Sequence, residues 1–315
     1  VSSRLANPDL KPELQSELEF GVETQALDNR AKLDLSVYNR KAKDQILSRT
    51  LDTSTGYSTT LINAGEISNK GIEAGITITP VRSNAVVWNA RFNFTRNVSK
   101  VVSLPEGSEQ ILISGFPTLG NYAIVGQPFN VIQSQYAERD ADGNFIIDEN
   151  GDYAVSSDIG IIGNPNPKWL GSWINDVTWK GITFSFQWDY VQGGDVYSFG
   201  AATMVGRGVA KELEDFDPGL PLILPGVKES DGTPNDVPQT TSGVFFGNTI
   251  IGANVNDRGV FDGTRIRLRE VSLGYNIPQN IVSKLSIRSA HISLVGNNMW
   301  WRALNAPKYS KADFD

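Results

Sequence analysis

Residues 181–190 alternate strictly between apolar and polar side chains. The apolar side chains occupy the even positions and the polar ones the odd positions: Ile182, Phe184, Phe186, Trp188 and Tyr190 against Thr183, Ser185, Gln187 and Asp189. Because successive side chains of a β-strand point to opposite faces, this stretch predicts a strand with one aromatic face and one polar face. A strand of a soluble β-sandwich also alternates, so the environment of this strand has to be inferred from the rest of the chain.

The same two-residue period returns along the whole chain and predicts about eight strands. Within the last third, the apolar phase shifts by one residue, which predicts a β-bulge near Arg269 or Glu270. Lys180 and Gly181 are expected to form a two-residue hairpin turn. A helix is expected within 196–215, where apolar residues are spaced by four. The expected strands cover residues 13–26, 31–41, 69–79, 86–96, 169–179, 182–190, 264–277 and 291–298.

Short and long connections alternate between these strands. The short ones lie near 28–30, 80–84, 180–181 and 278–285, and the long ones cover 44–66, 105–165 and 195–258. A sandwich has no reason to keep all its long loops at one end, whereas an outer-membrane barrel does, with the long loops outside the cell. The pattern therefore favours an all-β, antiparallel transmembrane β-barrel with long extracellular loops, in which residues 42–66 form a loop without regular structure.

The phase of each strand then predicts which side chains face lipid and which face the barrel lumen. The residues expected to face lipid are Leu14, Phe20, Leu35, Ile76, Phe92, Trp173, Phe184, Phe186 and Leu294. The charged residues expected to face the lumen are Glu17, Glu19, Glu23, Arg91, Asp176, Asp189, Arg265 and Arg267.

Composition narrows the chemistry further. The 315 residues contain no Cys and a single His, which excludes a disulfide framework, a thiolate metal site and a multi-histidine metal site. The net charge of −7 argues against a nucleic-acid surface. No run of 18 apolar residues exists, so the sequence predicts no membrane helix. We interpret His291 as a lumen-facing or hydrogen-bonded residue, because no catalytic partner set accompanies it.

The acidic stretch from Asp140 to Asp152 has two interpretations. Its carboxylates and amides stand at alternate positions, as calcium ligands do. However, Phe145 takes the place of the required Gly at position six of a calcium loop, and Gly151 that of the Glu at position twelve. Asp-Gly and Asn-Gly pairs are also good turn formers, and no cofactor is expected otherwise.

Six motifs along the chain resemble those of SusC-like TonB-dependent transporters and follow the family order. They are NPDLKPE at 7–13, NAGEISNKGIE at 63–73, GNPNPKW at 163–169, QGGDVYS at 192–198, RLREVSLGY at 267–275 and VGNNMW at 295–300. The resemblance implies a segment of a plugged barrel of about 22 strands. Residues 1–315 are expected to be the C-terminal part of that barrel, without the plug and the final strands, and to neither fold nor transport alone.

The family also implies a location and partners. The barrel would lie in the outer membrane of a Gram-negative cell, in contact with membrane lipid. It would import oligosaccharides or peptides together with a SusD-like surface lipoprotein. The TonB complex would supply force through the missing N-terminal part.

The residues leave two other functions to consider, a small free-standing barrel and an enzyme. A free-standing small outer-membrane barrel would be an adhesin or a structural protein. A β-sandwich glycosidase would need two carboxyl groups facing one another about 5–10 Å apart. The strand carboxylates instead line a continuous polar face, and no isolated acid sits among apolar residues, so we do not expect an enzyme.

Overall fold

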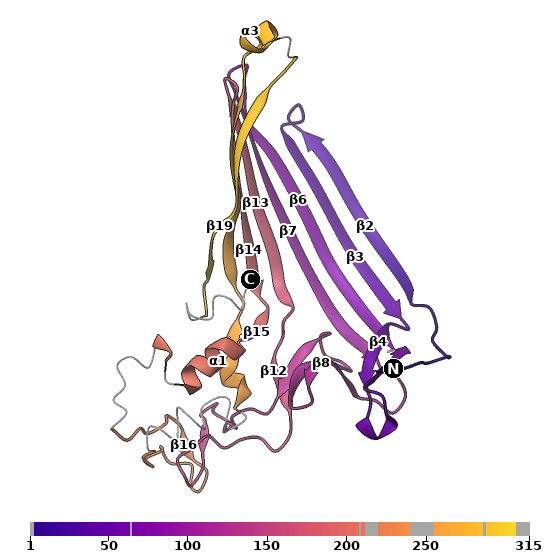
Figure 1. The fold of residues 1–315 in the computed structure, drawn as a ribbon, viewed down its shortest axis with the longest axis vertical. Coiled ribbons are helices and arrows are strands. Elements are labelled where there is room, and N and C mark those ends of the chain that lie inside the picture. The colour runs from indigo at the N-terminus through magenta and orange to yellow at the C-terminus, as the bar shows by residue number, and fades with distance from the viewer. Residues whose placement is uncertain are drawn as a thin grey trace.

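The computed structural model describes residues 3–63, 65–207, 209–211, 220–239, 255–285 and 288–306. One antiparallel sheet of eight strands dominates it, in the spatial order β19-β18-β14-β13-β7-β6-β3-β2 (Figure 1). The strands are β2 (Leu14–Ala26), β3 (Ala31–Lys43), β6 (Glu66–Arg82), β7 (Val86–Ser103), β13 (Pro167–Trp179), β14 (Ile182–Gly193), β18 (Arg265–Asn276) and β19 (His291–Ala303). The eight predicted strands are thus confirmed. Several of them extend beyond the residues in which apolar and polar side chains alternate.

The connections divide between the two ends of the sheet as the sequence predicts. Figure 1 shows the short turns and α3 (Gln279–Val282) at one end of the sheet. The other end carries α1 together with three short strands, β4 (Ile46–Thr50), β8 (Gln110–Phe116) and β16 (Val227–Lys228). α1 (Phe199–Gly206) lies within the range expected to hold a helix, although residues 208 and 212–219 lie outside the described residues. No helix among the described residues is long and apolar enough to cross a membrane.

Strand pairing sorts the side chains onto two faces, because directly opposed residues point to the same side of a sheet. One row of opposed residues crosses seven strands on one side: Leu33, Ile76, Phe92, Trp173, Trp188, Leu268 and Trp300. We call the side that carries this row the apolar face and the other side the polar face. All nine side chains expected to face lipid lie on the apolar face.

Two local features confirm the predicted register. Lys180 and Gly181 join Trp179 to Ile182, and both have positive φ, 47° and 87°. That conformation belongs to a type I′ turn, whose twist matches the twist of the strands it connects. Further along, Gln187 opposes Glu270 and Trp188 opposes Leu268, so Arg269 is the extra residue of the predicted bulge.

Asn175, on β13, is a polar residue that is buried on the apolar face. Asn175 is only 2% exposed, and its Oδ1 accepts a hydrogen bond of 3.0 Å from the indole Nε1 of Trp88. The indole N–H has no acceptor in lipid, so the neighbouring amide supplies one.

The expectation of a loop without regular structure at 42–66 is wrong. β4 (Ile46–Thr50) pairs with β5 (Thr59–Asn63), and β5 also pairs in parallel with β1 (Arg4–Leu5). These strands are too short for a two-residue period to stand out from the sequence. Asn63 ties them together, since its side chain contacts the backbone of Lys11 and Asp44.

The two longer connections fold into a separate body, which we call the loop lobe and define as the described residues of 104–166 and 194–264. β8 (Gln110–Phe116), β9 (Leu119–Ile124), β10 (Val131–Ser134) and β12 (Gly160–Gly163) form its four-stranded sheet. The remaining strand pairs are β11 (Ile146–Ile147) with β16 (Val227–Lys228) and β15 (Asp195–Tyr197) with β17 (Val260–Asp262).

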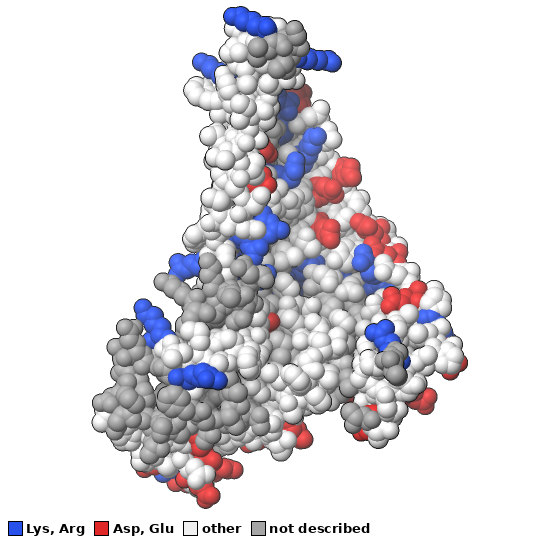
Figure 2. All heavy atoms as spheres, viewed as in Figure 1, with Lys and Arg blue, Asp and Glu red and all other residues white. Residues whose placement is uncertain are grey.

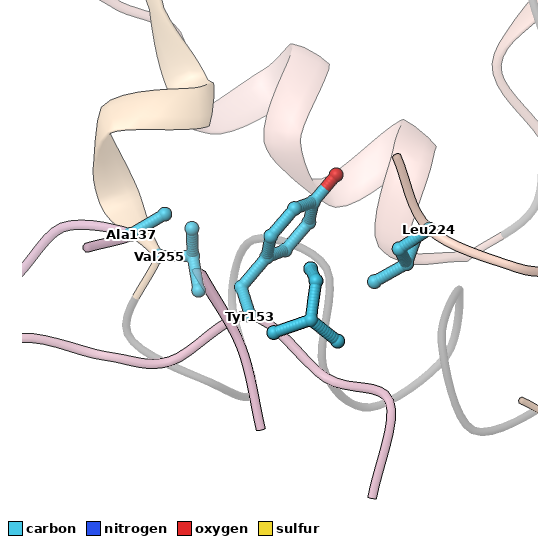
Figure 3. Packing of buried hydrophobic residues seen from close by; sticks show 5 residues of the cluster. Ala137, Tyr153, Leu224 and Val255 are labelled. Carbon is cyan, nitrogen blue, oxygen red and sulfur yellow. The ribbon is translucent and has the colours of Figure 1, made fainter. Parts of the chain in front are cut away.

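The loop lobe has a core of ordinary soluble type. Figure 3 shows four of its labelled members packed around one another: Ala137, Tyr153, Leu224 and Val255. Ile147 completes the cluster and has no exposed surface. The segments that supply these residues are far apart in sequence, so the core joins the two connections into one body.

Candidate functional site: the polar face of the sheet

All eight charged residues predicted to face the lumen lie on the polar face. One row of opposed residues links two of them on β2 and β18 and crosses seven strands: Glu23, Asp34, Gly75, Asn93, Ser172, Asp189 and Arg267. Glu17, Glu19, Arg91, Asp176 and Arg265 share the alternating phase of that row on their strands. The eight charged residues therefore share one face of the sheet.

An acidic cluster occupies the β2 edge of the polar face. Glu17 forms an ion pair with Arg40 on β3. Glu19 accepts a hydrogen bond of 2.6 Å from the Ser36 hydroxyl. Glu23 opposes another carboxylate, Asp34, so this edge keeps an excess of negative charge.

A basic cluster occupies β18 on the far side of the sheet. Asp189 on β14 opposes Arg267 and accepts a hydrogen bond of 2.8 Å from the Gln187 amide. Arg269 reaches the same carboxylate, with 3.6 Å between its Nε and Asp189 Oδ2. Arg265 lies two residues before Arg267 and donates a hydrogen bond of 3.1 Å to the Gly263 carbonyl.

Sequence reasoning missed Arg269, although the signal was present. The bulge predicted near Arg269 or Glu270 interrupts the alternation, so a residue at that point need not follow the phase of its strand. The side chain of Arg269 therefore forms an ion pair with Asp189 on the polar face and does not lie among the apolar residues.

The structure does not bring Arg91 and Asp176 into either cluster. Arg91 lies between Thr77 and Ile174 in its row, and Asp176 lies between Asn89 and Ser185. Both side chains are exposed, in the part of the sheet where amides and hydroxyls predominate. Figure 2 shows acidic and basic side chains interspersed along the slope formed by the strands.

Neutral hydrogen-bonding groups predominate in the middle of the polar face. Asn97 donates to Asn69 over 3.1 Å, and Asn93 donates to Ser172 over 2.9 Å. The ring of Tyr38 lies directly over Gly71, where a Cβ would come within 2.2 Å of it. A side chain at position 71 would have to displace this ring, which covers the backbone of Gly71.

The acidic stretch of the loop lobe is built from two similar turns. Asp140 Oδ1 accepts from the backbone N–H groups of Asp142 and Asn144, at 3.0 and 2.8 Å. Asp148 Oδ1 accepts from Asn150 and Asp152 in the same way, at 2.9 and 2.8 Å. The hydrogen bond from the Asn144 side chain lowers the pKa of Asp140. These carboxylates serve their own turns, and the described residues hold no group of three or more acidic or His side chains suited to a metal ion.

Further contacts involve His291 on β19 and two arginines of the loop lobe. His291 Nδ1 lies 2.9 Å from Asn276 Oδ1, as expected for a hydrogen-bonded residue. In the loop lobe, the guanidinium of Arg139 lies 3.8 Å from the centre of the Phe145 ring, and that of Arg258 lies 5.3 Å from it. Burial raises the pKa of the neighbouring Tyr153 hydroxyl.

The two faces of the sheet and the alternation of short and long connections are also features of a known family of proteins. Residues 2–218 match the sequence family described as "TonB dependent receptor-like, beta-barrel". The chain belongs to this family. The predicted resemblance, the antiparallel transmembrane barrel fold and the outer-membrane location are confirmed, and members of this family are transport proteins rather than enzymes.

Similar proteins include TonB-dependent receptors of Formosa agariphila. Receptor P3 is 26% identical over 95% of this chain, and receptor P26 is 27% identical over 94%. The chain spans about a third of the length of these relatives, 30% and 31%.

Solved structures show the same fold at lower identity. The RagAB peptide transporter superposes with a TM-score of 0.70 at 20% identity, covering 96% of this chain and 33% of that one. The RagAB peptide importer in its "closed-closed" state gives a TM-score of 0.69 at 18% identity, covering 94% of this chain and 33% of that one. The eight strands and their long connections are therefore a shared architecture.

Proposed function

We propose that this chain forms part of the wall of a TonB-dependent importer in the outer membrane. The observation that carries the proposal is the separation of an aromatic, lipid-compatible face from a charged one across eight paired strands, in a chain of the TonB-dependent receptor family. A charged side chain in the middle of a bilayer costs about 2–4 kcal/mol, so only the apolar face can meet lipid. The polar face then lines the lumen, where water or a plug solvates its charges.

The eight charged residues of the polar face would act on what passes through or fills the lumen. The acidic cluster of β2 and the basic cluster of β18 lie on opposite sides of a middle part in which amides and hydroxyls predominate. Such a distribution orients a plug or a polar ligand and holds it weakly enough for release. Amides and hydroxyls at the centre suit the hydrogen-bonding groups of an oligosaccharide or a peptide.

The partners follow from the same proposal. A SusD-like surface lipoprotein would cover the end that carries the loop lobe. The TonB complex would act through a part of the transporter other than this wall. The fold shared with RagAB, whose structure is described as that of a peptide transporter, supports an importer.

The orientation can be tested with inserted tags. Tags near Ser54, between β4 and β5, and near Asp231, after β16, should be labelled on intact cells. A tag at Asn29, in the turn between β2 and β3, should be labelled only after lysis. Labelling of Asn29 on intact cells would invert the proposed topology.

The importer can be separated from a free-standing small barrel by a refolding experiment. β2 and β19 each pair on one side only among the described strands, and unpaired backbone in hydrocarbon costs several kcal/mol per group. Residues 1–315 expressed alone should therefore give no heat-modifiable, protease-resistant monomer in detergent micelles. If such a monomer forms, the result would favour a free-standing small barrel that acts as an adhesin or a structural protein.

Transport itself is the direct test. Uptake of labelled oligosaccharides and peptides by cells with the complete transporter should stop when TonB is deleted. Replacing Asp189 and Arg267 by Asn and Gln should alter uptake without changing the amount of barrel in the membrane. Uptake that continues at the same rate without TonB would refute the proposed function.

A further inference from the structure

The apolar face carries a band of basic residues near the end with the loop lobe. Only one acidic residue, Glu66, lies on this face among the described residues of the eight strands. The basic residues on the same face are Lys41, Lys43, Lys70, Arg96, Lys100 and Arg302.

Glu66 neutralises only part of this band. Its carboxylate lies 3.3 Å from the ammonium of Lys41 and 3.6 Å from that of Lys43. Lys70, Arg96 and Lys100 are exposed and form no ion pair with the described residues. A positive excess therefore remains on a surface that is otherwise aromatic and aliphatic.

The basic band lies at the level where the hydrocarbon layer of the membrane ends, measured from the short turns. From Val86, next to the short turn, β7 advances ten residues to Arg96. At about 3.4 Å per residue and a tilt of about 40°, Arg96 lies roughly 25 Å above the turn. The apolar band of an outer-membrane barrel is also about 25 Å tall, so Arg96 meets the level of the lipid headgroups.

An apolar groove lies directly below Arg96. It has a volume of about 420 Å³, and Gly171 provides its floor, because a glycine leaves a depression among large rings. Aromatic rings form its walls, with Trp169 stacked on Tyr190 at 4.8 Å and Phe92 on Trp173 at 5.9 Å between ring centres. A Cβ at position 171 would meet the Trp169 ring at 3.2 Å, so the depression depends on the glycine.

A polar hollow of about 560 Å³ adjoins this groove and shares Phe94 and Trp169 with it. The hollow lies where β7 continues past Thr95, while its pairing with β13 ends there. Its lining includes Arg96, Lys168 and the amides of Asn164 and Asn166. An apolar groove thus opens into a basic, hydrogen-bonding hollow at headgroup height.

We propose that the groove and the hollow together bind an anionic acyl lipid of the surrounding membrane. An acyl chain would lie over Gly171 between the aromatic rings, and a phosphate-bearing headgroup would contact Arg96, with Lys100 on the same face contributing charge. β7, β13, β14 and β18 are inner strands of the sheet, so strands joining at β2 or β19 do not cover this surface. The site depends on the outer-membrane location but not on what is imported.

The experiment titrates the complete transporter that contains this chain, in neutral detergent, with a bisphosphorylated acylated glucosamine disaccharide. Bound lipid is counted by native mass spectrometry. Each basic residue near an anionic lipid surface contributes about a fivefold affinity change, so Arg96→Gln combined with Lys100→Gln should weaken binding about 30-fold. Gly171→Leu should weaken binding by filling the groove. Arg96→Lys alone should retain most of the affinity.

Arg91→Gln is the matched control, because Arg91 lies on the same strand but on the polar face. It should leave lipid binding unchanged. The dephosphorylated disaccharide should bind the unaltered protein at least tenfold more weakly, a comparison that needs no variant to fold. Equal binding of the two lipids, or an equal loss in Arg91→Gln, would overturn the proposal. Equal binding would instead assign the groove to a neutral acyl chain, such as the anchor of a lipoprotein.

Discussion

The eight-stranded sheet exposes its large apolar side chains, whereas the loop lobe buries them. In the sheet, large apolar side chains are turned outward, with Phe20 67% and Leu294 78% exposed. In the loop lobe, Ile147 and Val255 have no exposed surface. The sheet thus lacks a core of its own on its apolar face and is held by backbone pairing, whereas the lobe is held by side-chain packing.

This difference in exposure indicates which environment surrounds each region. Apolar surface exposed on this scale is stable only if something apolar covers it, and the bilayer does so for a barrel. The loop lobe resembles a small soluble domain and needs only its own core. A substitution should therefore have different effects in the two regions, even where the residue types are similar.

The largest effect is expected from charge on the apolar face. Phe186→Arg should lower the stability of the inserted barrel by about 2–4 kcal/mol, because the guanidinium would lie in the middle of the bilayer. Assembly is measured as the heat-modifiable fraction in outer-membrane preparations. Gln187→Arg, one residue on and on the polar face, should assemble normally. Equal tolerance of both would remove the distinction between the two faces.

Backbone conformation at the β13–β14 turn should matter next. Gly181 has a φ of 87°, and an added Cβ would meet the Asn276 carbonyl oxygen at 3.2 Å. Gly181→Ala should therefore cost about 1–2 kcal/mol, measured by urea unfolding in lipid vesicles. Gly21→Ala is the control, because its Cβ would make only ordinary contacts, the nearest at 3.5 Å. A larger cost at position 21 would contradict the role of the turn.

Packing changes should affect only the lobe. Ile147→Val removes one buried methylene and should destabilise the lobe by about 0.5–1.5 kcal/mol. Faster hydrogen exchange or proteolysis of 104–166 would report this change, while barrel assembly stays normal. Ile161→Val, at a position that is 44% exposed, should have almost no effect. A loss of barrel assembly with Ile147→Val would show that the two regions are not independent.

The smallest effect concerns alkaline pH. Burial raises the pKa of Tyr153, so the folded lobe holds this proton more tightly than the unfolded chain does. The resulting stability is complete below the unfolded pKa of about 10 and is lost as pH rises through the folded pKa. Proteolysis of the lobe should accelerate more between pH 9 and 11 in the unaltered protein than in Tyr153→Phe. Identical acceleration in both would contradict the assignment.

The sheet could be predicted because each strand carries two signals in its own residues. Two-residue alternation located the strands, and its phase assigned the faces. A single phase shift located the bulge at Arg269, and the Lys180–Gly181 pair located a turn. The charged residues of the polar face followed from phase alone, although their division into two clusters depends on which strands are neighbours.

The loop lobe could not be predicted, because its core is made of contacts between distant segments. Ala137, Ile147 and Tyr153 come from one connection, and Leu224 and Val255 from the other. Its strands are short, so no period marks them. Asn175 could not be predicted either. It interrupts the apolar side chains of its strand, and its role, accepting a hydrogen bond from Trp88, depends on a neighbouring strand.

The alternation of short and long connections also determines how the sheet can assemble. β2–β3, β6–β7, β13–β14 and β18–β19 are four hairpins that close locally. Bringing β7 beside β13 requires closing residues 104–166 into a loop. Each doubling of loop length adds only about 0.6 kcal/mol of closure entropy, so this loop costs about 2–3 kcal/mol more than a four-residue turn. Hairpins are thus the units of assembly, and the segments between them can lengthen, shorten or exchange during evolution at little thermodynamic cost.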